Sequence, residues 1–201
     1  MTDPYDKILK FWFGHVEESV IPSENRARIW FGDNLEVDRE IKILFQDEFE
    51  LGSRGQHVDW ESSPHGQLAL IITLDQFSRH IHRGTSQAYA QDDYALSICK
   101  QGMQRSDDHA LSLIERVFYY FPLLHSENLS DQERSISEYE TLIELAFPET
   151  QVIYESFFKF ANHHYSIVQR FNRFPQRNRV LGRESTPGEL QYLQELEQHR
   201  G

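Results

Sequence analysis

One short stretch, residues 66–79, is the most apolar part of this chain and constrains its fold more than any other feature. Its apolar side chains fall on two stripes at helical spacing, one with Leu68, Ile71 and Ile72 and the other with Leu70, Leu74, Phe77 and Ile81. A helix that is apolar on nearly every side lies buried at the centre of a fold. We therefore expect the other segments to pack around this helix.

Asp75 falls on the first of these stripes, where a charge is costly unless it is paired. Arg79 lies one helical turn further on, at i+4, and can reach it. Two interpretations follow. Asp75 could be an acid–base residue whose pKa is raised by burial. It could instead form an ion pair with Arg79 that holds the core together, which is the more common use of buried ion pairs.

Amphipathic helical patterns cover the rest of the chain, and no segment shows the alternation of a strand. Cap-forming residues predict helix starts at Asp3–Pro4, Ser23, Ser63–Pro64, Thr85, Asp107 or Asp108, Ser130 and Thr186. The longest helix is expected at about 149–171. Pro122 is expected to break the helix that starts at Asp107 or Asp108. These patterns predict an all-α fold of about eight helices in a single domain, residues 1–201.

The net charge of −12 disfavours nonspecific binding to nucleic acid or to an anionic membrane. Cys99 is the only cysteine, which excludes an internal disulfide and a cysteine-based zinc site. The N-terminal residues contain no apolar leader, and no run is long enough to span a bilayer. A cytoplasmic protein is the expectation, and its oligomeric state stays open.

Two histidines and a second carboxylate are further candidates for chemistry. His125 and Glu127 follow the break at Pro122, on a turn suited to ligand binding or acid–base work. Equally, Glu127 could bond the free backbone ends of the flanking helices. His164 lies on an apolar helical stripe, where a histidine is more often a core residue. With Asp75 these groups could bind zinc, iron or manganese, but no ligand motif is present, so we expect neither metal nor cofactor.

A basic segment stands out in this acidic chain. Five arginines occur within fourteen residues: Arg170, Arg173, Arg177, Arg179 and Arg183. The planar guanidinium group favours carboxylate or phosphate partners. The partner could be a small anionic molecule or peptide, or it could be the protein's own acids, including Asp75 and Glu127. Internal pairing is slightly favoured.

Four stretches carry a family resemblance when taken together: Ile8–Gly14, Leu68–Arg79, Phe121–Glu127, and Arg170–Asn178 followed by Leu181–Ser185. In this order and spacing they resemble the bacterial "domain of unknown function 924" family over nearly the whole chain. The resemblance implies an all-helical, tetratricopeptide-like superhelical fold and no established activity. Two positions depart from the family pattern. The chain has Ser78-Arg79-His80 where the family has Pro-Arg-Asn, and Gln176 where the family has His, so Gln176 is given no acid–base role.

Two functional hypotheses follow, with a purely structural role for these residues as a third. The first is a binding module in which antiparallel helices form a groove for a small or peptidic anion. The second is a cofactor-independent enzyme that uses Asp75 or His125 for acid–base chemistry on an anionic substrate. The catalytic candidates are Asp75, His125, Glu127 and His164, and the ligand-binding candidates are Arg79, Arg170, Arg173, Arg177, Asn178 and Arg183.

Overall fold

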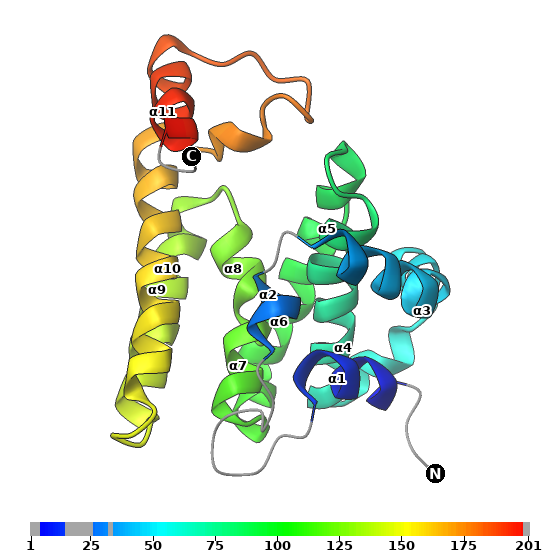
Figure 1. Ribbon diagram of the computed structural model, residues 1–201. Coiled ribbons are helices and arrows are strands. Elements are labelled where there is room, and N and C mark those ends of the chain that lie inside the picture. Colours follow the sequence, from blue (N-terminus) through cyan, green and yellow to red (C-terminus); the bar gives the residue numbers. More distant parts are fainter. Residues whose placement is uncertain (1–4, 15–25, 32–33, 199–201) are drawn as a thin grey trace.

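The computed structural model describes residues 5–14, 26–31 and 34–198, and within these ranges it contains helices and no strand (Figure 1). The α-helices are α1 (Asp6–Phe13), α2 (Ala27–Trp30), α3 (Leu35–Ser53), α4 (Pro64–Ile71), α5 (Ser78–Ile81), α6 (Asp92–Arg105), α7 (Leu113–Tyr119), α8 (Phe121–His125), α9 (Leu129–Leu145), α10 (Gln151–Phe171) and α11 (Pro187–Gln198). Short 3₁₀ segments lie at Val58–Ser62, Ser86–Tyr89, Asp107–Ala110 and Pro175–Arg177. The predicted all-α class is confirmed.

The apolar stretch forms the central helix, as expected. Helices α4 and α5 are one continuous run joined by the segment Ile72–Phe77, and every residue from 66 to 78 is buried. This run packs against α3, α6 and α7. Its middle differs from expectation, because Ile72–Phe77 is a π-helix. A π-helical turn is rare and is found most often at functional sites, and this one contains Asp75.

The first helix adds aromatic side chains to the same core. Trp12 and Phe13 are fully buried. The Trp12 ring centroid lies 5.7 Å from that of Phe77 and 5.4 Å from that of Phe118, both in edge-on geometry. Edge-to-face pairs of this kind are favourable beyond the area they bury. Thus α1 and α7 are both fixed to the central helix.

Two of the predicted helix starts are confirmed. Ser63 Oγ accepts the Gly66 N–H, and Pro64 is the first residue of α4. At α11, Thr186 and Glu189 form the predicted reciprocal capping box, with Thr186 N–H donating to Glu189 at 2.7 Å. The starts at Asp3–Pro4 and Ser23 lie outside the described residues.

Three predicted starts are wrong. Thr85 precedes a 3₁₀ segment, Asp107 and Asp108 begin another, and the following α-helices begin only at Asp92 and Leu113. Helix α9 begins before Ser130, because the Asn128 side chain accepts the Ser130 N–H at 2.9 Å and is the actual N-cap. Asparagine and serine are comparably good caps, so local preference did not distinguish the two positions.

Helices α9 and α10 pack along their lengths as an antiparallel pair (Figure 1). Helix α10 is the longest in the described part of the chain, as predicted, and it ends at Asn172 in the left-handed conformation (φ +54°). We call residues 172–186 the crossover segment, because they run from the end of α10 across the molecule and back to α11 (Figure 1). No helix among the described residues is long and apolar enough to cross a membrane.

Candidate functional site

Asp75 lies at the centre of a cluster of polar side chains, and its own side chain is fully buried. Its two carboxylate oxygens lie 2.8 and 2.9 Å from Nδ1 of His125, the last residue of α8. Gln76 Nε2 donates to it as well, and Arg79 Nη2 lies 3.4 Å away. Burial alone would raise the pKa of Asp75, but the charge of Arg79 and the hydrogen bonds from His125 and Gln76 outweigh burial and hold this pKa well below its ordinary value. Asp75 is therefore ionised.

His125 is held by this carboxylate in one orientation. An ionised carboxylate only accepts hydrogen bonds, so the proton of the neutral ring is on Nδ1. Burial lowers the pKa of His125, and Arg79 and Arg177 lower it further against the opposing effect of Asp75. The ring is accordingly neutral at pH 7. Its other nitrogen, Nε2, has no hydrogen-bond partner among the described residues.

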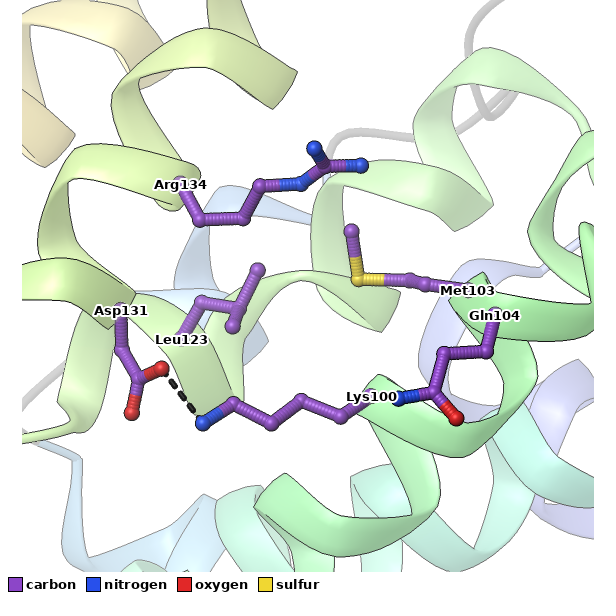
Figure 2. Close-up of a pocket in the computed structure, with 6 residues that line it drawn as sticks. All are labelled: Lys100, Met103, Gln104, Leu123, Asp131 and Arg134. Atoms are coloured by element: carbon purple, nitrogen blue, oxygen red, sulfur yellow. Dashed lines mark ion pairs between the residues drawn. The ribbon is translucent and has the colours of Figure 1, made fainter.

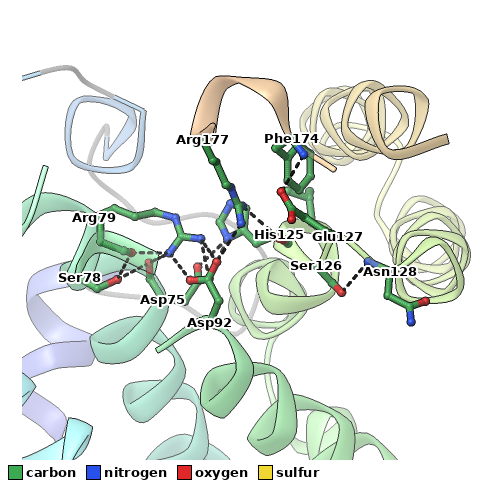
Figure 3. A network of polar contacts seen from close by, with 12 residues as sticks. Asp75, Ser78, Arg79, Asp92, His125, Ser126, Glu127, Asn128, Phe174 and Arg177 are labelled. Atoms are coloured by element: carbon green, nitrogen blue, oxygen red, sulfur yellow. Dashed lines mark hydrogen bonds and ion pairs between the residues drawn. The ribbon is translucent and has the colours of Figure 1, made fainter. Parts of the chain in front are cut away.

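Two arginines approach this pair from different parts of the chain (Figure 3). Arg79 donates through both terminal nitrogens to Asp92, at 3.0 and 3.1 Å. Arg177, from the crossover segment, donates to Asp92 at 3.1 Å and to the backbone carbonyl of His125 at 3.0 Å. Two carboxylates, Asp75 and Asp92, thus balance two guanidinium groups around a neutral imidazole.

Asp92 and Tyr89 were not identified from the sequence. Asp92 is the first residue of α6, where an acid is expected simply because it favours a helix N-terminus. The Tyr89 ring lies beneath both guanidinium groups, with its centroid 5.4 Å from Arg79 Cζ and 4.7 Å from Arg177 Cζ. Only the fold brings these residues to the site, because their positions in the sequence carry no motif.

Glu127 anchors the crossover segment. One of its oxygens accepts the Phe174 N–H at 2.8 Å, and Arg183 donates to both oxygens, at 2.6 and 3.0 Å. Burial raises the pKa of Glu127, but Arg183 and the Phe174 N–H outweigh burial and lower it overall. Both oxygens are engaged by the crossover segment, so this geometry favours the structural interpretation of Glu127 over the catalytic one.

Most of the predicted ligand-binding residues are bonded to other groups of the protein itself. Arg173 forms two bonds to Glu189, at 2.6 and 2.7 Å, and holds the pKa of that carboxyl at about 2. Asn178 bonds Ser185 and accepts from Arg183. Arg170 differs, because its guanidinium carbon lies 4.7 Å from the Phe171 ring centroid, and no acid pairs with it in the described part of the chain.

His164 lies close to His125 but does not bond it. The two ring centroids are 6.1 Å apart, and His164 Nδ1 bonds the Phe160 carbonyl at 2.9 Å. Burial, together with His125, lowers the pKa of His164 to about 3. Across the described residues, no three histidine, cysteine, aspartate or glutamate side chains are grouped as metal ligands would be.

A pocket of about 200 Å³ lies against this network. Its polar walls include His125, Arg177, Asp92 and Glu127, and its apolar walls include Leu96 and Leu181. Asp93 also lines it and is exposed, with no ion pair in the described structure. The arrangement joins an oriented neutral imidazole to a small space that can hold a ligand.

Fold and site together define an all-helical protein organised around a buried Asp–His pair. The sequence model of the bacterial proteins of unknown function DUF924 matches residues 8–197, and the chain belongs to this family, as the resemblance predicted. Among solved structures, it is similar to the protein of unknown function ATU0120 from Agrobacterium tumefaciens. The two are 31% identical, with a TM-score of 0.78, over 95% of this chain and 97% of the other. No curated protein matches the chain.

Proposed function

We propose that this protein is a cofactor-independent enzyme in which His125 is the general base for a small substrate bound in the pocket beside Arg177. One observation carries the proposal: Asp75 holds His125 through Nδ1, while Nε2 has no partner in the described structure and the ring lines a pocket. A carboxylate that orients a histidine in this way is the arrangement that supports proton transfer in many enzymes.

The alternative, a groove that binds an anion through the arginines, receives less support from the contacts. Arg79, Arg173, Arg177 and Arg183 all bond acids of the protein itself. The pocket beside His125 also contains more carboxylates than guanidinium groups. An anion would therefore have to compete with acids that are already in place.

In the proposed reaction, Nε2 of His125 takes a proton from a bound water or from the substrate. The resulting imidazolium is stabilised by the ionised Asp75, 2.8 Å from Nδ1. Arg177 also lines the pocket and stabilises negative charge that develops on the substrate. The proton returns from Nε2 to the product, so the site needs no other acid. A pocket of about 200 Å³ restricts the reaction to small molecules or to the end of a larger one.

The π-helical turn gives independent support. It is built into the centre of the most buried helix, where regular α-helical hydrogen bonding would be favoured, and Asp75 lies within it. Irregular turns of this kind are frequently found at functional sites.

The experiment is a turnover screen with small esters, amides, lactones and carbonyl compounds with acidic C–H groups. His125→Gln is expected to lower the rate of any accepted substrate by about 10²–10⁴-fold while circular dichroism shows an intact fold. The matched control is His163→Gln, because His163 is the exposed neighbour of His164 on α10 and should leave the rate unchanged. A rate that survives His125→Gln contradicts the proposal.

A further inference from the structure

A second pocket, of about 310 Å³, opens between α6 and α9 (Figure 2). Lys100, Met103 and Gln104 of α6 form one wall, Asp131 and Arg134 of α9 form the other, and Leu123 of α8 lies between them. Clefts that bury drug-sized ligands have volumes of roughly 300–1,000 Å³. The space therefore fits a compact molecule.

The rim of this pocket holds hydrogen-bond donors that the described structure does not use. Arg134 is 60% exposed, and it touches one acid, Glu138, through a single nitrogen at 2.7 Å. Lys100 Nζ has one partner, Asp131, at 2.5 Å. The Gln104 amide is exposed and has none among the described residues. Most N–H groups of these three side chains are therefore free to bond a ligand.

The carboxylate at the same rim is already engaged. Asp131 is the only carboxylate among the described residues that line the pocket. Its Oδ1 pairs with Lys100, and its Oδ2 accepts the Ser126 hydroxyl at 2.8 Å. Several free N–H donors beside a carboxylate that is already engaged favour a ligand that brings its own acceptors, and the arginine fork fits a carboxylate in particular.

The interior between the two helices is apolar. Leu123 is fully buried, and Met103 is half-buried with its thioether directed between the helices (Figure 2). The methylene chain of Lys100 extends along the edge of the same space (Figure 2). Methionine adapts readily to the shape of a ligand. An apolar interior below a donor-rich rim is suited to a molecule with one charged end.

We propose that the pocket between α6 and α9 binds a small carboxylate with an apolar body, such as a short fatty acid or an aromatic acid. The carboxylate bonds Arg134 and Lys100, and the apolar body packs on Met103 and on the methylene chain of Lys100. This site is separate from the pocket of His125 and is independent of the proposed reaction. It also differs from the five-arginine segment, where the sequence led us to expect the anion.

The test is an NMR titration of the whole chain with hexanoate, followed at the backbone amides and the Met103 methyl group. We expect saturable shifts at residues 100–104 and 131–134. Arg134→Ala should weaken binding about ten- to a hundredfold, because a charge-assisted bond is lost. Arg39→Ala is the matched control, since Arg39 is an exposed arginine on α3, far from the pocket in sequence and fold.

Two further comparisons complete the test. Hexan-1-ol has the same apolar body without the carboxylate and should bind at least tenfold more weakly than hexanoate. His125→Gln should leave hexanoate binding unchanged, so failure of the proposed enzyme would not affect this result. The proposal is overturned if hexanoate gives no saturable shifts, if Arg134→Ala binds it as tightly as the wild type, or if hexan-1-ol binds equally well.

Discussion

Nδ1 of His125 lies 2.8 Å from Oδ1 of Asp75, although the two residues are 50 positions apart in the chain. Asp75 comes from the π-helical turn of the central helix, and His125 ends α8. Their contact joins the central helix to α8. It also decides which nitrogen of His125 carries the proton, and so whether the ring can act as a base.

Asp75→Asn should be strongly destabilising. The substitution keeps the shape of the side chain but leaves Arg79 and His125 buried beside a neutral amide. Removing one partner of a buried pair costs about 3–5 kcal/mol in the free energy of unfolding. Urea denaturation measures this loss, with Asp93→Asn as the exposed control, expected within about 0.5 kcal/mol of wild type. Similar stabilities for the two variants would contradict the account of a tightly coupled buried pair.

Stability should fall as the solution is acidified below neutral pH. The pKa of His164 is lowered to about 3 in the folded state, whereas a histidine in the unfolded chain has its ordinary pKa of about 6.5. Between these two pH values only the unfolded chain binds the proton. Through this histidine, each pH unit between those two values lowers the free energy of unfolding by less than about 1.4 kcal/mol, because its side chain is partly exposed and solvent weakens the effect. The lowered pKa of His125 acts in the same direction. The pKa of His65 is raised by its bond to Glu115, so His65 has the opposite effect on how stability changes with pH.

The contribution of His164 can be isolated by comparison with His164→Gln. Unfolding free energies of both proteins at pH 7, 6 and 5 should show a shallower decline in the variant. Parallel curves would mean that His164 is as easily protonated in the folded protein as in the unfolded chain.

Gly102→Ala should destabilise the protein, although alanine is the better helix former by about 1 kcal/mol. A methyl group at Gly102 would overlap the Tyr119 hydroxyl and approach Gln67 Oε1, and these two groups are joined by a buried hydrogen bond of 2.6 Å. Overpacking of this kind costs about 1–3 kcal/mol. The matched control is Gly188→Ala in α11, where no atom lies within 4 Å of the added methyl group, so stability should rise slightly. Thermal melts show whether each substitution raises or lowers stability. A rise in melting temperature for both variants would contradict the close approach of Tyr119 to Gly102.

Glu127 and Arg183 should be energetically coupled. A double-mutant cycle with Glu127→Ala and Arg183→Ala is expected to give an interaction energy within the range of about 0.5–3 kcal/mol, because both side chains are mostly buried and joined by two bonds. The exposed pair Arg28–Glu36, 64% and 81% exposed, is the comparison and should give less than about 1 kcal/mol. Additive effects at Glu127 and Arg183 would mean that this contact does not anchor the crossover segment.

What the sequence predicted well depended on local spacing. The Asp75–Arg79 contact follows from one helical turn, and the burial of the central helix follows from its two apolar stripes. The Asp75–His125 bond could not be derived in this way, because no local rule relates residues 50 positions apart. Both residues were chosen as candidates for their own chemistry, and the fold joined them.

The arginine segment shows the limit of composition as evidence. Its charge suggested an external anion, or acids of the protein, and the acids it pairs with include Asp92 and Glu189, neither of which the sequence marked as a partner of an arginine. An acid in the first turn of a helix is expected for local reasons, so a second, long-range role for Asp92 is invisible in the sequence. Likewise, the segment gave no sign that unused donors would lie instead on α6 and α9.

The most direct test of the central claim is a pH titration of the His125 imidazole nitrogens by ¹⁵N NMR, assigned with His125→Gln. We predict that at pH 7 Nδ1 carries the proton and Nε2 does not, and that the ring becomes protonated only below pH 6.5. In the Asp75→Asn variant, the proton of the neutral ring should no longer be confined to Nδ1. A ring that carries its proton on Nε2 at pH 7, or that is already an imidazolium, would contradict a base held ready by Asp75.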